Sequence, residues 1–392
     1  MTYPGGQLIN FIPSKDMSSP KAVFLTLGIY PGGPTRLATE VRAQQNLAAL
    51  RALNYDLTIV TAPDAAGRPL AENVVLVEPP PINNFVRMHT RWRYRRQIRR
   101  QVAQLVTGPD TIIFCEHWAA LLCVPRHPRV VYSFHDFESN LVKVRRLRKS
   151  SSVTWKTRAY WGLADWLERR LLLKAKRVIS VSASEAIKLH DEFNSVVEYI
   201  PTVPLAEPVA TKKFNDGPLR LWLYGSSGAT SNKVILDHLI DKLFTPLSSA
   251  LPGAEFHQAG SYQTYDVDKI EWLREHFHVH GFVDEPALLF RPGDICLMPY
   301  QQDTGFRTKI PEVCGYGMIC AGYAETFACC PEMRDGYNCI IAETPDALVK
   351  KMASVAGEHA LRERLAAGAI ETSRRDFSFA ALLERYRRIL SF

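Results

Sequence analysis

Short apolar runs alternate with amphipathic stretches along the first half of the chain. After the run at residues 21–28, apolar positions recur at helical spacing over residues 35–53. The runs are rich in Val and Ile and cover residues 21–28, 56–61, 73–77, 111–115, 129–133 and 177–181. Apolar strands that alternate with helices are typical of a parallel sheet covered by helices on both faces. The first half is therefore predicted to be an α/β domain.

The second half repeats this pattern. Residues 201–213 lie between the halves, are rich in proline and lack periodicity, which indicates a linker. Strands are predicted at residues 219–224, 255–259, 278–280, 294–298, 318–321 and 339–341, and helices at 232–247 and 268–277. The pattern predicts two Rossmann-like domains, residues 1–202 and 203–375, that face each other across a cleft. A ligand would then bind at the carboxyl ends of the strands of both sheets.

Composition and charge narrow the class of protein. The chain has 392 residues, of which 46% are hydrophobic and 22% charged, and this excludes a mainly disordered or coiled-coil protein. It has neither a transmembrane-length apolar run nor a signal-peptide pattern, so we expect a cytoplasmic protein. Its eight cysteines form no Cys-x-x-Cys pair, so we expect reduced thiols. Residues 1–200 hold 28 Lys and Arg against 16 Asp and Glu, a net charge of +12, whereas the remainder carries −4. The first domain therefore suits an anionic partner.

The stretch from residue 298 to residue 320 holds the strongest candidate chemistry. A predicted strand ends at Pro299, and a polar loop then brings Arg307, Lys309 and Glu312 within six residues of one another. A helix that starts near Lys309 would point backbone N–H groups at the cleft, and the two cations beside them suit a diphosphate. Glu312 could accept hydrogen bonds from sugar or ribose hydroxyls. The alternative is a solvated helix start of mixed charge.

These motifs resemble the group 1, glycogen-synthase-like glycosyltransferases of the family 4 type, which have the GT-B fold. The family pattern of Pro, a polar loop and Gly-x-Arg-x-Lys-x-x-Glu matches Pro299 and the segment from Gly305 to Glu312. Residues 175–182, 279–283 and 335–341 resemble further family segments. The resemblance implies a retaining glycosyltransferase that uses a nucleotide-diphosphate sugar and needs no cofactor or metal. It also implies that residues 376–392 form a helix that returns to the first domain.

The resemblance also assigns site residues. His135, at the end of a predicted strand, is expected to face the donor sugar as a catalytic residue together with Glu312. His117 also ends a strand, but a histidine beside Trp118 is often only packed. Gly32 and Gly33 match the family's glycine pair, with Gly32 toward the acceptor, and a plain β-turn is the alternative. The donor is expected to contact Gly33, Gly225, Gly228, Val283, Thr304, Gly305, Phe306, Arg307, Lys309 and Glu312.

Two departures from the family pattern affect how the donor sugar would be held. Many members have a Glu eight residues before Glu312, where this chain has Thr304, and Ile319 replaces a Pro. A variant of the pattern lacks that first Glu. The departures leave a non-catalytic subunit open, and an epimerase or phosphorylase would share the fold.

A short acidic motif in the second half resembles a metal site. Asp266-Val-Asp268 has the Asp-x-Asp spacing that metal-dependent glycosyltransferases of another fold use. It precedes an amphipathic segment, so we expect it to begin a helix with an Asp as cap. No metal site is therefore predicted.

Residues 91–100 form a strongly basic segment of the first domain. They hold six arginines, among them Arg95, Arg96 and Arg99, beside an apolar stripe at helical spacing. Basic side chains with interleaved aromatics suit an anionic membrane surface, which predicts peripheral contact with the inner face of a membrane and a glycan or lipid-linked acceptor. No nucleic-acid-binding motif accompanies the charge, so we expect no nucleic-acid partner. The alternative is a solvated helix that packs on its own sheet.

Overall fold

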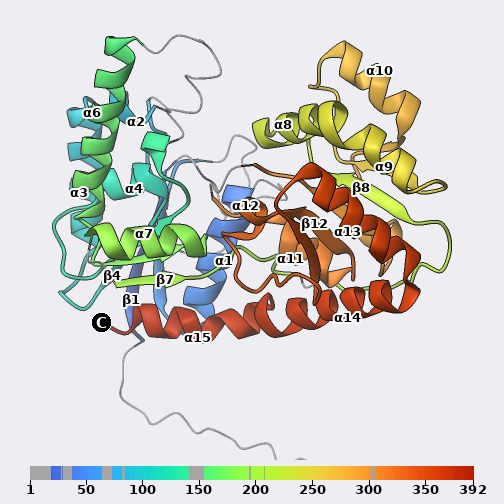
Figure 1. Ribbon diagram of the computed structural model, residues 1–392. Helices are drawn as coiled ribbons and strands as arrows, with labels where there is room; N and C mark the ends of the chain where they lie inside the picture. Colours follow the sequence, from blue (N-terminus) through green and yellow to red (C-terminus); the bar gives the residue numbers. More distant parts are fainter. Residues whose placement is uncertain are drawn as a thin grey trace, which may run out of the picture.

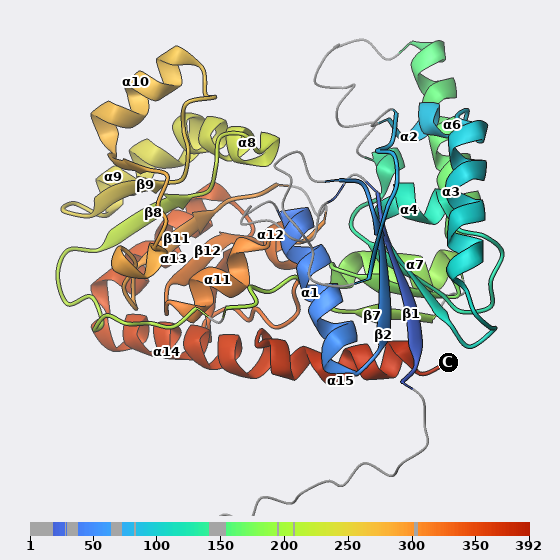
Figure 2. The same cartoon turned by 180° about the vertical axis from the view of Figure 1, so that it is seen from behind.

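Two parallel β-sheets, one from each half of the chain, organise the molecule (Figures 1 and 2). The computed structural model describes residues 19–27, 29, 38–63, 73–81, 84–140, 154–193, 196–206, 208–301 and 305–392. The first sheet has the order β3-β2-β1-β4-β5-β6-β7. Its strands are β1 (Lys21–Thr26), β2 (Asp56–Thr61), β3 (Val74–Leu76), β4 (Ile112–Glu116), β5 (Val130–Phe134), β6 (Arg177–Ser180) and β7 (Val196–Tyr199).

The second sheet has the equivalent order β10-β9-β8-β11-β12-β13. Its strands are β8 (Arg220–Tyr224), β9 (Glu255–Ala259), β10 (His278–Gly281), β11 (Ile295–Met298), β12 (Ile319–Tyr323) and β13 (Cys339–Ala342). In both sheets the order reverses beside the first strand, at β1/β4 and at β8/β11. Such reversals create a crevice at the carboxyl ends of the strands, where ligands of these folds bind. The expected α/β class with two Rossmann-like sheets is confirmed.

The first sheet is buried on both faces because its strands are apolar at successive positions. Ala22 and Phe24 of β1 pack into one core, and Val23 and Leu25 pack into the other. Side chains on a strand alternate between faces, so each strand supplies both cores. One face is covered by α2 (Phe85–Met88), α3 (Trp92–Leu105), α4 (His117–Cys123), α6 (Trp155–Leu172) and α7 (Ala183–Phe193), and the other by α1 (Ala38–Ala52).

The helices of the second half differ from the sequence prediction at one point. The single helix expected over residues 232–247 is α8 (Thr230–His238), a π-helical turn (Leu239–Leu243) and α9 (Phe244–Ala250). Pro246 has no amide hydrogen to donate, which interrupts the regular hydrogen-bond ladder at this point. The other helices are α10 (Val267–His276), a 3₁₀ turn (Pro286–Leu288), α11 (Lys309–Gly315), α12 (Ala324–Phe327), α13 (Pro345–Gly357) and α14 (His359–Asp376).

The last helix, α15 (Phe379–Leu390), returns to the first sheet, as expected (Figures 1 and 2). It follows α14 and packs on β6, β7 and α1. Leu382, Tyr386 and Ile389 are buried there, and Arg177 of β6 donates to the Ile389 carbonyl at 2.9 Å. Strand β7, which sequence reasoning missed, is an edge strand beside β6, and none of its four residues is fully buried.

Candidate active site

The loop after β11 and the loop after β5 meet where the carboxyl ends of the two sheets approach each other. Gly305 has a φ of +62°, and a Cβ added there would overlap the Asp136 carboxylate. The Gly305 amide donates to Glu185 of α7 at 3.4 Å. Asp136 directly follows His135, and Gly305 lies two residues before Arg307. The structure therefore brings the predicted catalytic histidine and the predicted donor loop to one site.

His135 is held by a buried carboxylate. Its Nε2 contacts Oε1 of Glu116, the last residue of β4, whose side chain is completely buried. Asn46 of α1 donates to the other oxygen of Glu116 at 2.5 Å and to Ser133 at 3.0 Å. Because the carboxylate is itself held in place, it fixes the orientation of the imidazole ring.

This hydrogen-bonded chain continues into the C-terminal helix. The Tyr386 hydroxyl of α15 donates to Asn46 Oδ1 at 2.5 Å and accepts from Gln45 at 3.1 Å. Gln45 also accepts from the Val203 amide, in the segment that joins the two halves, at 2.8 Å. Sequence reasoning missed Glu116, Asn46 and Tyr386. The burial of Gln45 and Asn46 on α1 is what points to these partners, because polar side chains in a core need them, and only the structure shows that burial.

On the donor side, glycines end three neighbouring strands. Gly225, Gly260 and Gly281 follow or end β8, β9 and β10, with φ values of +134°, +120° and +69°. The Gly225 amide donates to Ala259 at 2.9 Å, and the Gly260 amide donates to Gly281 at 2.6 Å. A Cβ on Gly260 would overlap the Gly225 backbone, so glycine is required at this position. Sequence reasoning did not identify Gly260. Gly228 has ordinary space for a Cβ, whose nearest atom would be Ser226 Oγ at 3.5 Å.

Lys309 lies against the Gly225 turn. Its ammonium donates to the Tyr224 carbonyl and, at 3.2 Å, to Asn232 of α8. A Cβ on Gly225 would be 3.0 Å from this ammonium. Lys309 is the first residue of α11, so the expected helix start is confirmed, although the Thr308 side chain makes no capping hydrogen bond.

Arg307 and Glu312 complete the polar side of the site. The Arg307 guanidinium stacks on the Tyr300 ring at 4.1 Å from its centroid, and the Tyr300 hydroxyl donates to Asn232 at 3.3 Å. Glu312 accepts a hydrogen bond from the Tyr224 hydroxyl at 2.9 Å. The two cations, the carboxylate and the Gly225 turn are thus linked through Tyr224 and Asn232.

Two comparisons of the sequence now bear on this arrangement. The family model Glycosyltransferase Family 4 matches residues 39–203, and Glycosyl transferases group 1 matches residues 220–358. Together they match more than three quarters of the chain. The chain belongs to the group 1 glycosyltransferases of the GT-B fold.

Solved structures agree with this glycosyltransferase in fold. Sucrose-phosphate synthase from Thermosynechococcus elongatus is 12% identical with a TM-score of 0.67, covering 94% of this chain and 97% of that one. HepE of Anabaena in complex with UDP-glucose is 15% identical with a TM-score of 0.61, covering 95% and 99%. WaaG, a glycosyltransferase involved in lipopolysaccharide biosynthesis, is 11% identical with a TM-score of 0.60, covering 94% and 99%. A search of curated proteins found no significant match.

The remaining residues that the sequence predicts at the donor or acceptor site fall into two groups. Val283 and Phe306 are partly buried and pack against the core that contains the second sheet. Gly32, Gly33 and Thr304 lie outside the described residues.

His117, the second candidate histidine, is packed beside His135. Its ring meets the His135 ring edge to face, with centroids 5.7 Å apart, and its Nε2 is 3.7 Å from Glu138. Burial, followed by the charge of His135, lowers the pKa of His117 to about 3. His117 also has a φ of +70°, which is uncommon for a residue with a side chain. His117 therefore packs against His135 as a neutral ring.

The acidic motif of the second half begins α10 as expected. Asp266 occupies the N-cap position without a capping hydrogen bond, and its carboxylate lies 3.2 Å from Lys269. Among the described residues of the glycosyltransferase, no group of three His, Cys, Asp or Glu side chains is placed to hold a metal ion.

The basic segment of the glycosyltransferase forms α3 and divides its arginines between two environments. Tyr94, Ile98 and Val102 are buried, as the apolar stripe predicted. Arg96 is exposed, whereas Arg95 and Arg99 are half-buried. None of the helices that the structure describes is long and apolar enough to cross a membrane.

Proposed function

We propose that this glycosyltransferase transfers a sugar from a nucleotide-diphosphate sugar to a glycan or a lipid-linked glycan, with retention of the anomeric configuration. The observation that carries the proposal is the meeting of Gly305 with Asp136. It supports the proposal because Gly305 lies two residues before Arg307 and Asp136 directly follows His135. The complex of HepE with UDP-glucose supports a uridine nucleotide as the donor class.

Arg307 and Lys309 bind the donor diphosphate in this proposal. Lys309 already donates to Tyr224 and Asn232, and its third hydrogen is available to a phosphate oxygen. Gly225 has no side chain, and the Asn232 amide and the Lys309 ammonium lie where its Cβ would be, so the ammonium lies directly beside the backbone of this turn. As the glycosidic bond breaks, negative charge grows on the leaving diphosphate, and the two cations stabilise it. The proposal uses no metal or cofactor.

His135 faces the donor sugar and Glu312 binds sugar or ribose hydroxyls. Glu116 accepts from the His135 ring on one side, which leaves the rest of the imidazole to orient the sugar or to stabilise charge. The Tyr224 hydroxyl donates to one oxygen of Glu312, and a carboxylate is the acceptor that sugar or ribose hydroxyls need. Retention rests on the family resemblance. The acceptor then attacks the anomeric carbon from the same face from which the nucleoside diphosphate leaves.

The exposed face of α6 supports a membrane-associated acceptor. Trp155, Trp166 and Leu173, at its start, middle and C-terminal end, are 75%, 49% and 65% exposed. Arg170 lies over the Trp166 ring at 4.4 Å from its centroid. Exposed aromatic side chains flanked by cations suit the interface of an anionic bilayer. The participation of WaaG in lipopolysaccharide biosynthesis is consistent with such an acceptor.

Nucleotide binding tests the donor site. Arg307→Ala should weaken binding of UDP about ten-fold or more, because a charge-assisted contact is lost. Isothermal titration calorimetry measures the affinity, and Arg374→Ala, which removes an exposed arginine of α14, is the matched control. Equal affinity of wild type and Arg307→Ala would contradict the assignment.

Turnover and stereochemistry test the reaction. Incubation with UDP-glucose and candidate glycans, followed by proton NMR of the product, should show a glucoside with the anomeric configuration of the donor. A product with the opposite anomeric configuration would contradict the retaining mechanism. Hydrolysis without transfer, or use of inorganic phosphate, would indicate an epimerase or phosphorylase, and UDP binding without turnover would indicate a non-catalytic subunit.

A further inference from the structure

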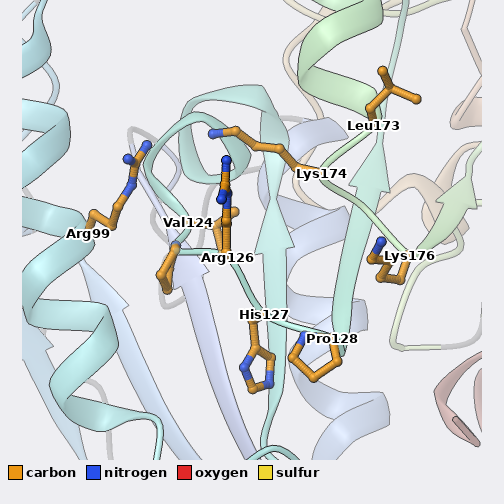
Figure 3. Close-up of a pocket in the computed structure, with 9 residues that line it drawn as sticks. Arg99, Val124, Arg126, His127, Pro128, Leu173, Lys174 and Lys176 are labelled. Carbon is orange, nitrogen blue, oxygen red and sulfur yellow. The ribbon is translucent and has the colours of Figure 1, made fainter.

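A basic pocket lies at the end of the first sheet that is opposite the active site (Figure 3). Its volume is about 760 Å³. Three segments form it: α3, the loop before β5 and the turn before β6. His135 follows the carboxyl end of β5, whereas the pocket borders its amino end. The five residues of β5 separate the two sites by roughly 17 Å.

The side chains that line this pocket are mostly cations. Arg99 comes from α3, Arg126 from the loop before β5, and Lys174 and Lys176 from the turn before β6. Figure 3 shows the head groups of Arg99, Arg126 and Lys174 pointing into the same space. Cations from three separate segments therefore converge.

These cations have no carboxylate partner among the described residues. None of the four forms an ion pair there, whereas nearby Arg129 pairs with Asp110 at 2.5 Å. The Nε atoms of Arg99 and of Arg95, one turn earlier on α3, are buried without a hydrogen-bond acceptor. Buried donors without acceptors are rare in folded proteins, so these two nitrogens favour an anionic ligand beside them.

Lys174 lies close to the arginines of α3 that border the pocket. Its ammonium donates to the carbonyls of Leu121 and Leu122 at 3.3 and 3.0 Å, which holds it in place. Burial, followed by the charges of Arg99 and Arg95, lowers the pKa of Lys174 to about 8. A bound anion would reverse that electrostatic cost.

The loop that carries Arg126 is held by its own contacts. Pro125 and Pro128 flank Arg126 and His127, and proline restricts the backbone. His127 Nε2 lies 2.5 Å from the Thr111 carbonyl. A fixed loop lowers the entropy that is lost when a ligand binds.

We propose that the pocket formed by Arg99, Arg126, Lys174 and Lys176 binds a phosphate-bearing ligand with at least two negative charges. The ligand is distinct from the sugar donor, because the pocket and His135 lie at opposite ends of β5. Soluble diphosphates and phosphomonoester head groups of lipids share this chemistry. The exposed Leu173 at the pocket lies at the end of α6 and makes a lipid source structurally accessible.

Pyrophosphate titration tests the pocket by direct binding, with no need for turnover. The Arg307→Ala background reduces binding at the donor site, and calorimetry then reports the pocket. Adding Arg99→Gln and Arg126→Gln should weaken pyrophosphate binding about ten-fold or more. The matched control adds Arg93→Gln and Arg100→Gln, two exposed arginines of the same helix, and removes the same charge. Circular dichroism checks that each variant is folded.

A second arm identifies the source of the phosphate. Co-sedimentation with vesicles of phosphatidylcholine that contain phosphatidic acid should fall in the Arg99→Gln/Arg126→Gln variant, and not in the control, if the ligand is a lipid. Pocket-dependent binding of pyrophosphate alone indicates a soluble ligand. If both pairs of substitutions weaken both kinds of binding equally, or neither does, the proposal is wrong.

Discussion

Gly260 shows how one residue controls the shape of the donor site. Its φ of +120° is rare for any residue with a side chain, and a Cβ there would overlap the Gly225 backbone. The close contact between these two turns sets where Gly225 lies beside Lys309. Gly228, three residues further along the same loop, has neither constraint. The residue type is therefore required at one position and free at the other.

Gly260→Ala should destabilise the protein and weaken donor binding together. We expect a loss of about 2 kcal/mol or more in the free energy of unfolding, because the substitution adds backbone strain and a steric overlap. Gly228→Ala is the matched control and should change the free energy of unfolding by less than about 1 kcal/mol. Urea denaturation and UDP titration of both variants measure the effects. Equal behaviour of the two variants would contradict the packing of Gly260 on Gly225.

His117 should make stability fall as the solution is acidified. Its pKa is about 3 in the folded chain against an ordinary 6.5, so between these values the unfolded state binds more protons. Lowering the pH through this window therefore favours unfolding, by up to about 1.4 kcal/mol per pH unit. His117→Asn keeps a residue that tolerates positive φ and removes the titrating group. Urea denaturation from pH 7 to pH 4 measures the free energy of unfolding of wild type and variant. As the pH falls, the advantage of the wild type over the variant should shrink or reverse.

At the scale of elements, α15 does more than cover the first sheet. Through Tyr386 it reaches Asn46 of α1, then Glu116 of β4, and finally His135 after β5. Three elements, α15, α1 and β4, thus support the imidazole ring that follows β5. Tyr386 is completely buried, which raises the pKa of its hydroxyl to about 12 and keeps it a donor at neutral pH.

Tyr386→Phe should lower kcat while leaving the KM for the donor nearly unchanged. The variant loses the hydroxyl that holds Asn46, so Glu116 and His135 lose support, while the diphosphate contacts stay intact. We expect a several-fold fall in kcat and a loss of about 1 kcal/mol in stability. Initial rates over a range of donor concentrations separate the two parameters. A rise in KM with unchanged kcat would contradict a positioning role for Tyr386.

At the scale of the molecule, the first domain presents two chemically different regions away from the candidate active site. The α6 face exposes Trp155, Trp166 and Leu173, and the basic pocket borders the C-terminal end of this helix. Both belong to the half with a net charge of +12. Both regions therefore suit an anionic bilayer on this side of the molecule.

Vesicle binding should depend on the α6 face and on salt. Trp155→Ser with Trp166→Ser should reduce co-sedimentation with anionic vesicles, because the aromatic rings no longer enter the interface. Val267→Ser with Leu288→Ser removes two exposed apolar side chains from the second domain and serves as the control. Binding should also fall as salt rises, since the Debye length is only about 8 Å at physiological ionic strength. Equal binding to neutral and anionic vesicles would contradict a contact with an anionic membrane.

The sequence by itself determined the α/β class, most strand positions, the start of α11 and the cation pair at Arg307 and Lys309. These depend on residues close together in the chain, because periodicity and helix starts are local properties. Only the tertiary structure decided the partners of His135, the contact of Gly260 with Gly225 and the convergence of cations at Lys174. Asn46 meets Glu116 across 70 residues and Tyr386 across 340, and no local pattern encodes such a meeting. Hydrogen-bond partners in a core are chosen when elements pack, so they follow from the fold rather than from neighbouring residues.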